Sequence, residues 1–317
     1  MIVLYILLLV VGFILLTKGA DKFVDACSKL AKAVGIPSLI VGLTIVAFGT
    51  SAPECAVSVI ASIKGNSDIA IGNVVGSNIC NLLLVLGTAS FFGDLYCKKK
   101  IITRDFVYSL LSYVVIIVMS IGAFNFQNGT GFISRSNGIL LLLFLLIYVY
   151  SLVIEAKDSI KSKKKEEKEK ITVWDVIWIF VGLVAIVGGG ELVVTSATNI
   201  AKVIGISDKV IALTVVAIGT SLPELVTSVV AVRKGEHDIA IGNVIGSNIF
   251  NIFMILGLSG LANPLHLDIN TLIDMFVMFA SGLTVFLLTL HNMKIGRKRG
   301  IFMLLIYITY TVYLFIR

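Results

Sequence analysis

Long apolar segments, separated by short polar ones, run through the whole chain. Most are close to the roughly 20 residues that an α-helix needs to cross the apolar core of a bilayer. They do not alternate apolar and polar residues as the strands of an outer-membrane barrel do. We therefore expect an all-α integral membrane protein with ten transmembrane helices, the first and sixth running on into 21–34 and 191–204. The apolar segments lie at about 2–17, 38–63, 69–92, 106–124, 138–154, 171–188, 210–232, 239–261, 272–290 and 300–316.

The composition of the chain supports this interpretation. Hydrophobic residues make up 57% of the 317 residues and charged residues 14%. In soluble domains, roughly 45–50% of the residues are hydrophobic and about 25% are charged. Ten helices leave no room for a sizeable soluble domain, so we expect neither an enzyme nor a bound cofactor.

The net charge of +7 could indicate a nucleic-acid partner, but the basic residues lie in short segments between apolar runs. With ten helices, 21 of the 26 lysines and arginines fall in the odd-numbered connections. Basic residues favour the cytoplasmic face of a membrane protein. We therefore expect a multi-pass protein with both termini outside, no nucleic-acid partner and no evident protein partner.

The segment 155–170 carries seven lysines and five acidic residues, and it is interpreted as a solvated cytoplasmic linker. It divides the chain into a first repeat at 1–154 and a second repeat at 171–317. The four cysteines show neither metal-ligand spacing nor a disulfide framework.

An internal repeat is the strongest signal in the sequence. Residues 37–87 match 207–257 at 28 of 51 positions, without a gap, at an offset of 170. GTSAPE matches GTSLPE, and DIAIGNVVGSNICN matches DIAIGNVIGSNIFN. Each half has five helices, an odd number, so the second half enters the membrane from the opposite side. Inverted repeats are typical of secondary transporters with a site near the membrane midplane.

Glu54 and Glu224 are the acids that lie deep inside the expected spans, at matching positions of the two repeats. A charged side chain at the bilayer centre costs about 2.5–3.5 kcal/mol on insertion scales. The sequence provides no lysine or arginine at the same depth. A mobile cation or a proton must then compensate these carboxylates.

Further oxygen ligands surround the two glutamates in the sequence. Pro53 and Pro223 each remove a helical hydrogen bond and free backbone carbonyls about one turn earlier, near Ala47–Thr50 and Ala217–Thr220. Hydroxyl side chains lie close to each proline in the sequence. The next apolar segments place further polar side chains at intervals of four residues, on one helical face. Such all-oxygen sets suit hard cations, above all Ca²⁺. The side chains are Thr50, Ser51, Ser77 and Asn81, then Thr220, Ser221, Ser247 and Asn251. Asn73, Asn78, Asn243 and Asn248 are interpreted as hydrogen bonding between helices instead.

The doubled motif GTSxPE followed by GNxxGSNxxN resembles the cation/Ca²⁺ antiporter superfamily, in its sodium/calcium exchanger branch, and the resemblance covers the whole chain. It is similar to the compact members in the prokaryotic inner membrane. The resemblance implies exchange of Ca²⁺ for Na⁺, two inverted five-helix repeats with broken helices 2, 3, 7 and 8, and sliding of long helices 1 and 6. It implies ion ligands at Ala47, Thr50, Ser51, Glu54, Ser77, Asn81, Ala217, Thr220, Ser221, Glu224, Ser247 and Asn251.

One position departs from the family pattern. Well-known exchangers carry an aspartate where this chain has Asn251, so its site has one potential carboxylate fewer. Two glutamates still balance one Ca²⁺. An amide cannot take a proton, so coupling to H⁺ would run through Glu54 or Glu224. A Ca²⁺/H⁺ antiporter and a cation channel remain alternatives at this stage.

Overall fold

The computed structural model describes residues 2–162, 171–205, 217–290 and 292–316. Within these ranges, eight helices are long and apolar enough to cross a membrane, and a bent pair adds a ninth span. The protein is therefore a helical, multi-pass membrane protein. The seventh expected helix, 210–232, lies partly outside the described residues.

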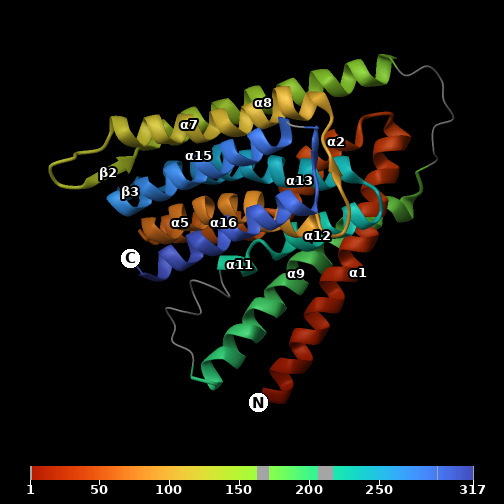
Figure 1. Ribbon diagram of the computed structural model, residues 1–317, viewed down its shortest axis with the longest axis horizontal. Helices are drawn as coiled ribbons and strands as arrows, with labels where there is room; N and C mark the ends of the chain where they lie inside the picture. Colours follow the sequence, from red (N-terminus) through yellow and green to blue (C-terminus); the bar gives the residue numbers. More distant parts are fainter. Residues whose placement is uncertain (1, 163–170, 206–216, 291, 317) are drawn as a thin grey trace.

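The first and sixth expected helices are the two longest among the described residues, and they pack along each other. α1 (Ile2–Val34) and α9 (Val173–Val203) run obliquely to the other helices (Figure 1). The backbones approach closely at glycines: a Cβ on Gly189 would lie 2.8 Å from the carbonyl oxygen of Gly12. Both helices extend well past their apolar segments, so this expectation is confirmed.

The remaining spans lie beside one another (Figure 1). The span built on α13 is buried throughout its most apolar window, and the span built on α5 is 72% buried. These two form the centre of the bundle, and outer helices shield them from lipid. The elements are α5 (Ser67–Cys80), η2 (Asn81–Val85), α6 (Leu86–Ala89), η3 (Ile101–Asp105), α7 (Phe106–Gly122), α8 (Arg135–Ser162), α13 (His237–Phe250), η5 (Asn251–Leu256), α14 (Gly257–Ala262), α15 (Ile269–Leu290) and α16 (Arg297–Ile316).

The second span is bent by 49° between Thr50 and Ala52. Pro53 explains the bend, because it has no N–H to donate and its ring clashes with the preceding turn. Ser51 at the bend has φ −81° and ψ 6°, and Ser221 before the second proline has φ −89° and ψ 6°. The bent span contains α2 (Ser38–Val41), η1 (Gly42–Val46), α3 (Ala47–Thr50) and α4 (Ala52–Ile63); its repeat counterpart contains α11 (Ala217–Gly219) and α12 (Leu222–Arg233).

The third and eighth spans differ from the expectation of broken helices. Each continues through a π-helical segment that begins at Asn81 or Asn251. Neither segment contains a proline, so the chain widens locally without losing its helical course. Wide turns of this kind are common at functional sites.

Four short strands were not expected from the sequence. β1 (Leu95–Tyr96) pairs with β4 (Lys294–Ile295), and β2 (Thr130–Ile133) pairs with β3 (Leu265–Asp268). Each strand lies in a connection between spans, where the chain leaves the helix and its backbone groups need other partners. The strands tie together connections that are far apart in the sequence.

The expected linker is partly helical. α8 continues to Ser162, and Glu155 is buried against its neighbours, with Nζ of Lys100 2.7 Å from Oε1. The first residues of 155–170 therefore belong to the bundle. Residues 163–170 lie outside the described part of the chain.

Candidate functional site

Glu54 and Glu224 each lie in the first turn of a helix, directly after its proline. Both side chains are fully buried. The first turn of a helix favours an anionic side chain, because unpaired N–H groups point toward it. The two repeats thus place one carboxylate each at the start of α4 and α12, against the central helices α5 and α13.

Other buried acids show how unusual these two glutamates are. Asp105, Asp175 and Glu155 are also buried, and each has a basic partner. For example, Nζ of Lys29 lies 2.9 Å from Oδ1 of Asp175. Among the described residues, no lysine, arginine or histidine pairs with Glu54 or Glu224. Their charge is left to another group to balance.

Hydrogen bonds join the first repeat to Glu224. Its Oε1 accepts from the hydroxyl of Ser51 at 3.1 Å and from that of Ser247 at 3.4 Å. Thr50 donates to Oδ1 of Asn243 at 2.9 Å. Residues from both repeats therefore surround one carboxylate.

The carbonyl oxygen of Ala47 takes part in the same cluster. It accepts from the backbone N–H of Ser51 at 3.1 Å and from the hydroxyls of Ser247 and Thr50, each at 3.4 Å. The proline argument predicted free carbonyls in this turn, but the carbonyl of Ala47 is already hydrogen-bonded. A cation could use it only if these hydroxyls turned away. α11 begins at Ala217, the repeat counterpart.

Eight buried oxygens of the candidate residues have no hydrogen-bond partner among the described residues. A buried polar group left unpaired costs about 1–3 kcal/mol, and more if charged. Native structures contain only a few such groups, so their concentration at one set of residues calls for a ligand. The oxygens are both carboxylate oxygens of Glu54, Oε2 of Glu224, the hydroxyls of Ser77, Thr220 and Ser221, and Oδ1 of Asn81 and Asn251.

Every one of these atoms is an oxygen, as hard cations require. In the described part of the chain, no three histidines, cysteines, aspartates or glutamates come together as a metal-binding group. The set of candidate ligands holds carboxylate, hydroxyl and amide oxygens. It can surround a cation with two carboxylates and several neutral oxygens.

A cavity of about 540 Å³ reaches the starts of α4 and α12. Its wall includes Pro53, Thr220 and Pro223, and on α9 it includes Gly190 and Glu191. Apolar side chains form most of the rest. The cavity lies beside the prolines that directly precede Glu54 and Glu224, and neither glutamate lines it.

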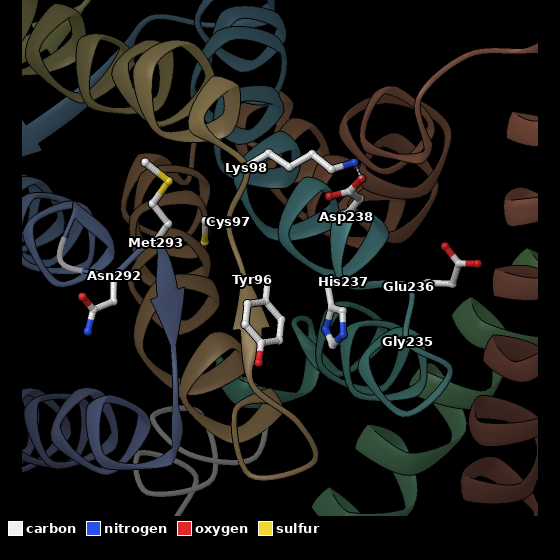
Figure 2. A pocket seen from close by; sticks show the side chains of 9 residues that line it. All are labelled: Tyr96, Cys97, Lys98, Gly235, Glu236, His237, Asp238, Asn292 and Met293. Atoms are coloured by element: carbon white, nitrogen blue, oxygen red, sulfur yellow. Dashed lines mark hydrogen bonds and ion pairs between the residues drawn. The ribbon is translucent and has the colours of Figure 1, made fainter.

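A second cavity, of about 410 Å³, lies beside the α12–α13 turn and the strand pair β1–β4. In Figure 2, Tyr96 and His237 face each other, and Lys98 reaches the carboxylate of Asp238. Glu236 points away from the cavity and accepts a hydrogen bond from Ser28 of α1. The acid that faces this cavity is already paired, so the cavity does not repeat the oxygen cluster of the centre.

Two asparagines keep the role that the sequence predicted. Asn73 donates to the backbone carbonyl of Glu54 at 3.2 Å, and Asn243 donates to that of Glu224 at 3.4 Å. They fasten α5 to α4 and α13 to α12. Sequence reasoning missed that Asn243 also reaches Thr50 of the other repeat.

Comparison with known proteins identifies a family. The model of the sodium/calcium exchanger protein family matches residues 4–154 and 174–316. The sodium/calcium exchanger MaX1 of Methanosarcina acetivorans is 35% identical, over 99% of both chains. Inner membrane protein YrbG of Escherichia coli is 39% identical over 82% of this chain and 81% of its own length.

A solved structure has the same architecture. The sodium-calcium exchanger NCX_Mj, soaked with 2.5 mM Na⁺ and 1 mM Sr²⁺, superposes with a TM-score of 0.85 and 33% sequence identity. The match covers 98% of this chain and 99% of that chain. The similarity therefore includes the whole helical bundle.

Proposed function

Since the chain belongs to the sodium/calcium exchanger protein family, we propose that it exchanges Ca²⁺ for Na⁺ across the membrane by alternating access. The observation that carries the proposal is a set of eight buried oxygens, three of them on Glu54 and Glu224, that have no hydrogen-bond partner in the described part of the chain. Members of this family are membrane exchangers and not catalysts. Ca²⁺ and Na⁺ are the transported substrates, and no cofactor is needed.

The ligands of the transported ions, on this proposal, come equally from the two repeats. Glu54 and Glu224 supply two negative charges, which one Ca²⁺ balances. Hydroxyl, amide and carbonyl oxygens complete the 6–8 oxygen ligands that Ca²⁺ takes. They come from Ala47, Thr50, Ser51, Ser77 and Asn81, and from Ala217, Thr220, Ser221, Ser247 and Asn251.

Coupling follows from the cost of leaving the two carboxylates uncompensated. A buried ion without a partner is strongly unfavourable in a medium of low dielectric. A binding site without its ions should therefore resist the conformational change, while either bound load neutralises the glutamates and permits it. Ca²⁺ and Na⁺ compete for the same oxygens, so one leaves as the other binds.

Two inverted five-helix repeats, ten spans in all, would provide the two access states. The separate α1–α9 pair is the part best placed to slide, because it crosses the other helices obliquely (Figure 1). We propose a prokaryotic inner-membrane location, with both termini outside and the 155–170 linker in the cytoplasm. The excess of basic residues in the odd-numbered connections supports this orientation.

Uptake of ⁴⁵Ca²⁺ into proteoliposomes tests the proposal. Vesicles are loaded with Na⁺, given a pH gradient, or given neither. Uptake that requires internal Na⁺ is expected, and it would show that Asn251 permits sodium coupling. Uptake that requires only the pH gradient would replace Na⁺ by H⁺, moving through Glu54 or Glu224. Uptake with neither gradient would indicate a channel.

A further inference from the structure

The two central helices meet at a symmetric pair of asparagines, Asn78 of α5 and Asn248 of α13. The side-chain Nδ2 of Asn78 donates to the backbone carbonyl of Asn248 at 3.4 Å. The Nδ2 of Asn248 donates to the backbone carbonyl of Asn78 at 3.3 Å. Both side chains are fully buried, and the two positions differ by the repeat offset of 170.

Each of these asparagines also contacts a candidate ion ligand of the opposite repeat. Nδ2 of Asn251 donates to Oδ1 of Asn78 at 2.9 Å, although the two residues lie on different helices. Nδ2 of Asn81 donates to Oδ1 of Asn248 at 3.1 Å. In both contacts, the NH₂ group of a candidate ligand in one repeat donates to the side-chain oxygen of an asparagine in the other repeat.

An amide has two ends of nearly the same shape, and only its oxygen binds a cation. An acceptor that holds the NH₂ end decides which end is presented to the ion. The remaining oxygens of Asn81 and Asn251 are buried and have no partner in the described part of the protein. The crossed hydrogen bonds thus leave the two oxygens available for a ligand.

We infer that Asn78 and Asn248 are positioning residues, which fix the amides of Asn251 and Asn81 with their oxygens toward the transported cation. The inference rests on the proposed function, because it assigns these oxygens to the ion. It gives a role in ion binding to two residues that the sequence pattern alone assigns to helix packing.

The positioning residues are themselves held in one orientation. Nδ2 of Asn248 lies 2.8 Å from the hydroxyl of Tyr113 on α7, which also accepts from Ser109 at 3.1 Å. Nδ2 of Asn78 lies 3.5 Å from the sulfur of Met278 on α15. Because each NH₂ group already has acceptors, each Oδ1 must face the neighbouring ligand. Asn248 has the stronger support, since a phenol oxygen accepts better than a thioether sulfur.

A double-mutant cycle separates positioning from packing. Asn78→Leu is made in the native protein and in an Asn251→Asp background. The two oxygens of a carboxylate are equivalent, so an aspartate has no wrong end to present. We expect Asn78→Leu to weaken Ca²⁺ binding about 10–100-fold in the native background, as loss of an outer-shell partner does. In the aspartate background the loss should be less than about threefold.

The second cycle uses Asn248→Leu, with and without Asn81→Asp, and should give the same pattern. The readouts are the Ca²⁺ dissociation constant of the purified protein and the half-saturation and maximal rate of uptake. Half-saturation should rise more than the maximal rate falls. Equal losses of affinity in both backgrounds would reduce these residues to helix packing and overturn the inference.

If a leucine variant does not fold, Asn78→Ser and Asn248→Ser replace it, because a serine hydroxyl is too short to hold the neighbouring amide. The loss of Ca²⁺ affinity is then compared between the native and the aspartate backgrounds in the same way. Failure of the proposed function looks different, since ⁴⁵Ca²⁺ uptake by the unmodified protein would then not depend on internal Na⁺, whatever the variants do.

Discussion

Glu54 and Glu224 differ from the other buried acids in what surrounds them. Asp105, Asp175 and Glu155 have basic partners. The two glutamates have hydroxyls, amides and unpartnered oxygens around them. A residue whose charge has no protein partner must obtain that partner from solution. This is the physical basis for assigning ion binding to this pair.

Replacing either glutamate should remove coupled transport. Glu54→Gln or Glu224→Gln takes away one of the two charges that balance Ca²⁺, and an amide presents a donor to the ion. We expect Na⁺-dependent ⁴⁵Ca²⁺ uptake to fall at least about 100-fold, equivalent to roughly 2.7 kcal/mol. Asp158→Asn, on the exposed end of α8, is the control and should leave uptake unchanged. Full exchange by either glutamine variant would contradict the mechanism.

At the scale of elements, the α1–α9 pair depends on close backbone contact. A Cβ on Gly189 would lie 2.7 Å from the backbone nitrogen of Leu16 and 2.8 Å from the carbonyl oxygen of Gly12. Its neighbour Gly188 has nothing within 4 Å of the same added atom. Of these two adjacent glycines on α9, Gly189 is in close contact with the backbone of α1, and Gly188 faces open space.

Gly189→Ala should therefore separate the two long helices, whereas Gly188→Ala should not. Overpacking of a close contact costs about 1–3 kcal/mol, while Gly→Ala in open space inside a helix stabilises by roughly 0.5–1 kcal/mol. Thermal unfolding of the two purified variants in detergent measures the difference. Equal midpoints would mean that the close crossing does not stabilise the protein.

Ion pairs fasten α1 to the α12–α13 turn. Nζ of Lys234 lies 2.8 Å from Asp21 and 2.7 Å from Asp25. At the repeat-related position, Lys64 shows no ion pair with the described residues. If α1 slides during exchange, the contacts of Lys234 must break in each cycle.

Lys234→Gln should change the rate of exchange with little effect on half-saturation by Ca²⁺, because the pairs lie away from the oxygen cluster. Its effect on stability should stay below about 1 kcal/mol, since ion pairs between partly exposed groups contribute little. Uptake kinetics of Lys234→Gln and Lys64→Gln test this. A change of half-saturation in the first, or an equal rate change in both, would count against a role in motion.

At the scale of the whole molecule, orientation in the membrane can be read from two exposed positions. Asn128 lies in the loop before β2, and Lys161 lies near the end of α8. The proposed topology places them on opposite faces.

The native cysteines interfere little with such labelling. Cys27, Cys80 and Cys97 are buried. Burial raises the pKa of the Cys97 thiol to about 12, so this thiol stays protonated at neutral pH.

Single cysteines introduced at these positions should react from opposite sides. In a Cys55→Leu background, Asn128→Cys should react with a membrane-impermeant maleimide in intact cells. Lys161→Cys should react only in inverted vesicles. The parent without an introduced cysteine is the control and should not react from either side. The reverse pattern would invert the proposed orientation.

Several features of this protein follow from sequence alone. The helical, multi-pass class of the protein, the extension of α1 and α9 beyond the first and sixth apolar segments, and the family are confirmed. These properties can be predicted from local sequence, because each span in lipid must be apolar and must satisfy its own backbone hydrogen bonds. The oxygen ligands, the count of ten spans and the inverted repeats stay predictions.

Only the tertiary structure decided which groups meet. The pairing of β1 with β4 and the crossed bonds of Asn78 and Asn248 join residues far apart in the chain. The π-helical turns at Asn81 and Asn251 were likewise seen only in the structure. A local pattern cannot distinguish an asparagine that packs two helices from one that orients an ion ligand. The difference lies in which end of each amide is held, and that depends on a neighbour from the other half of the protein.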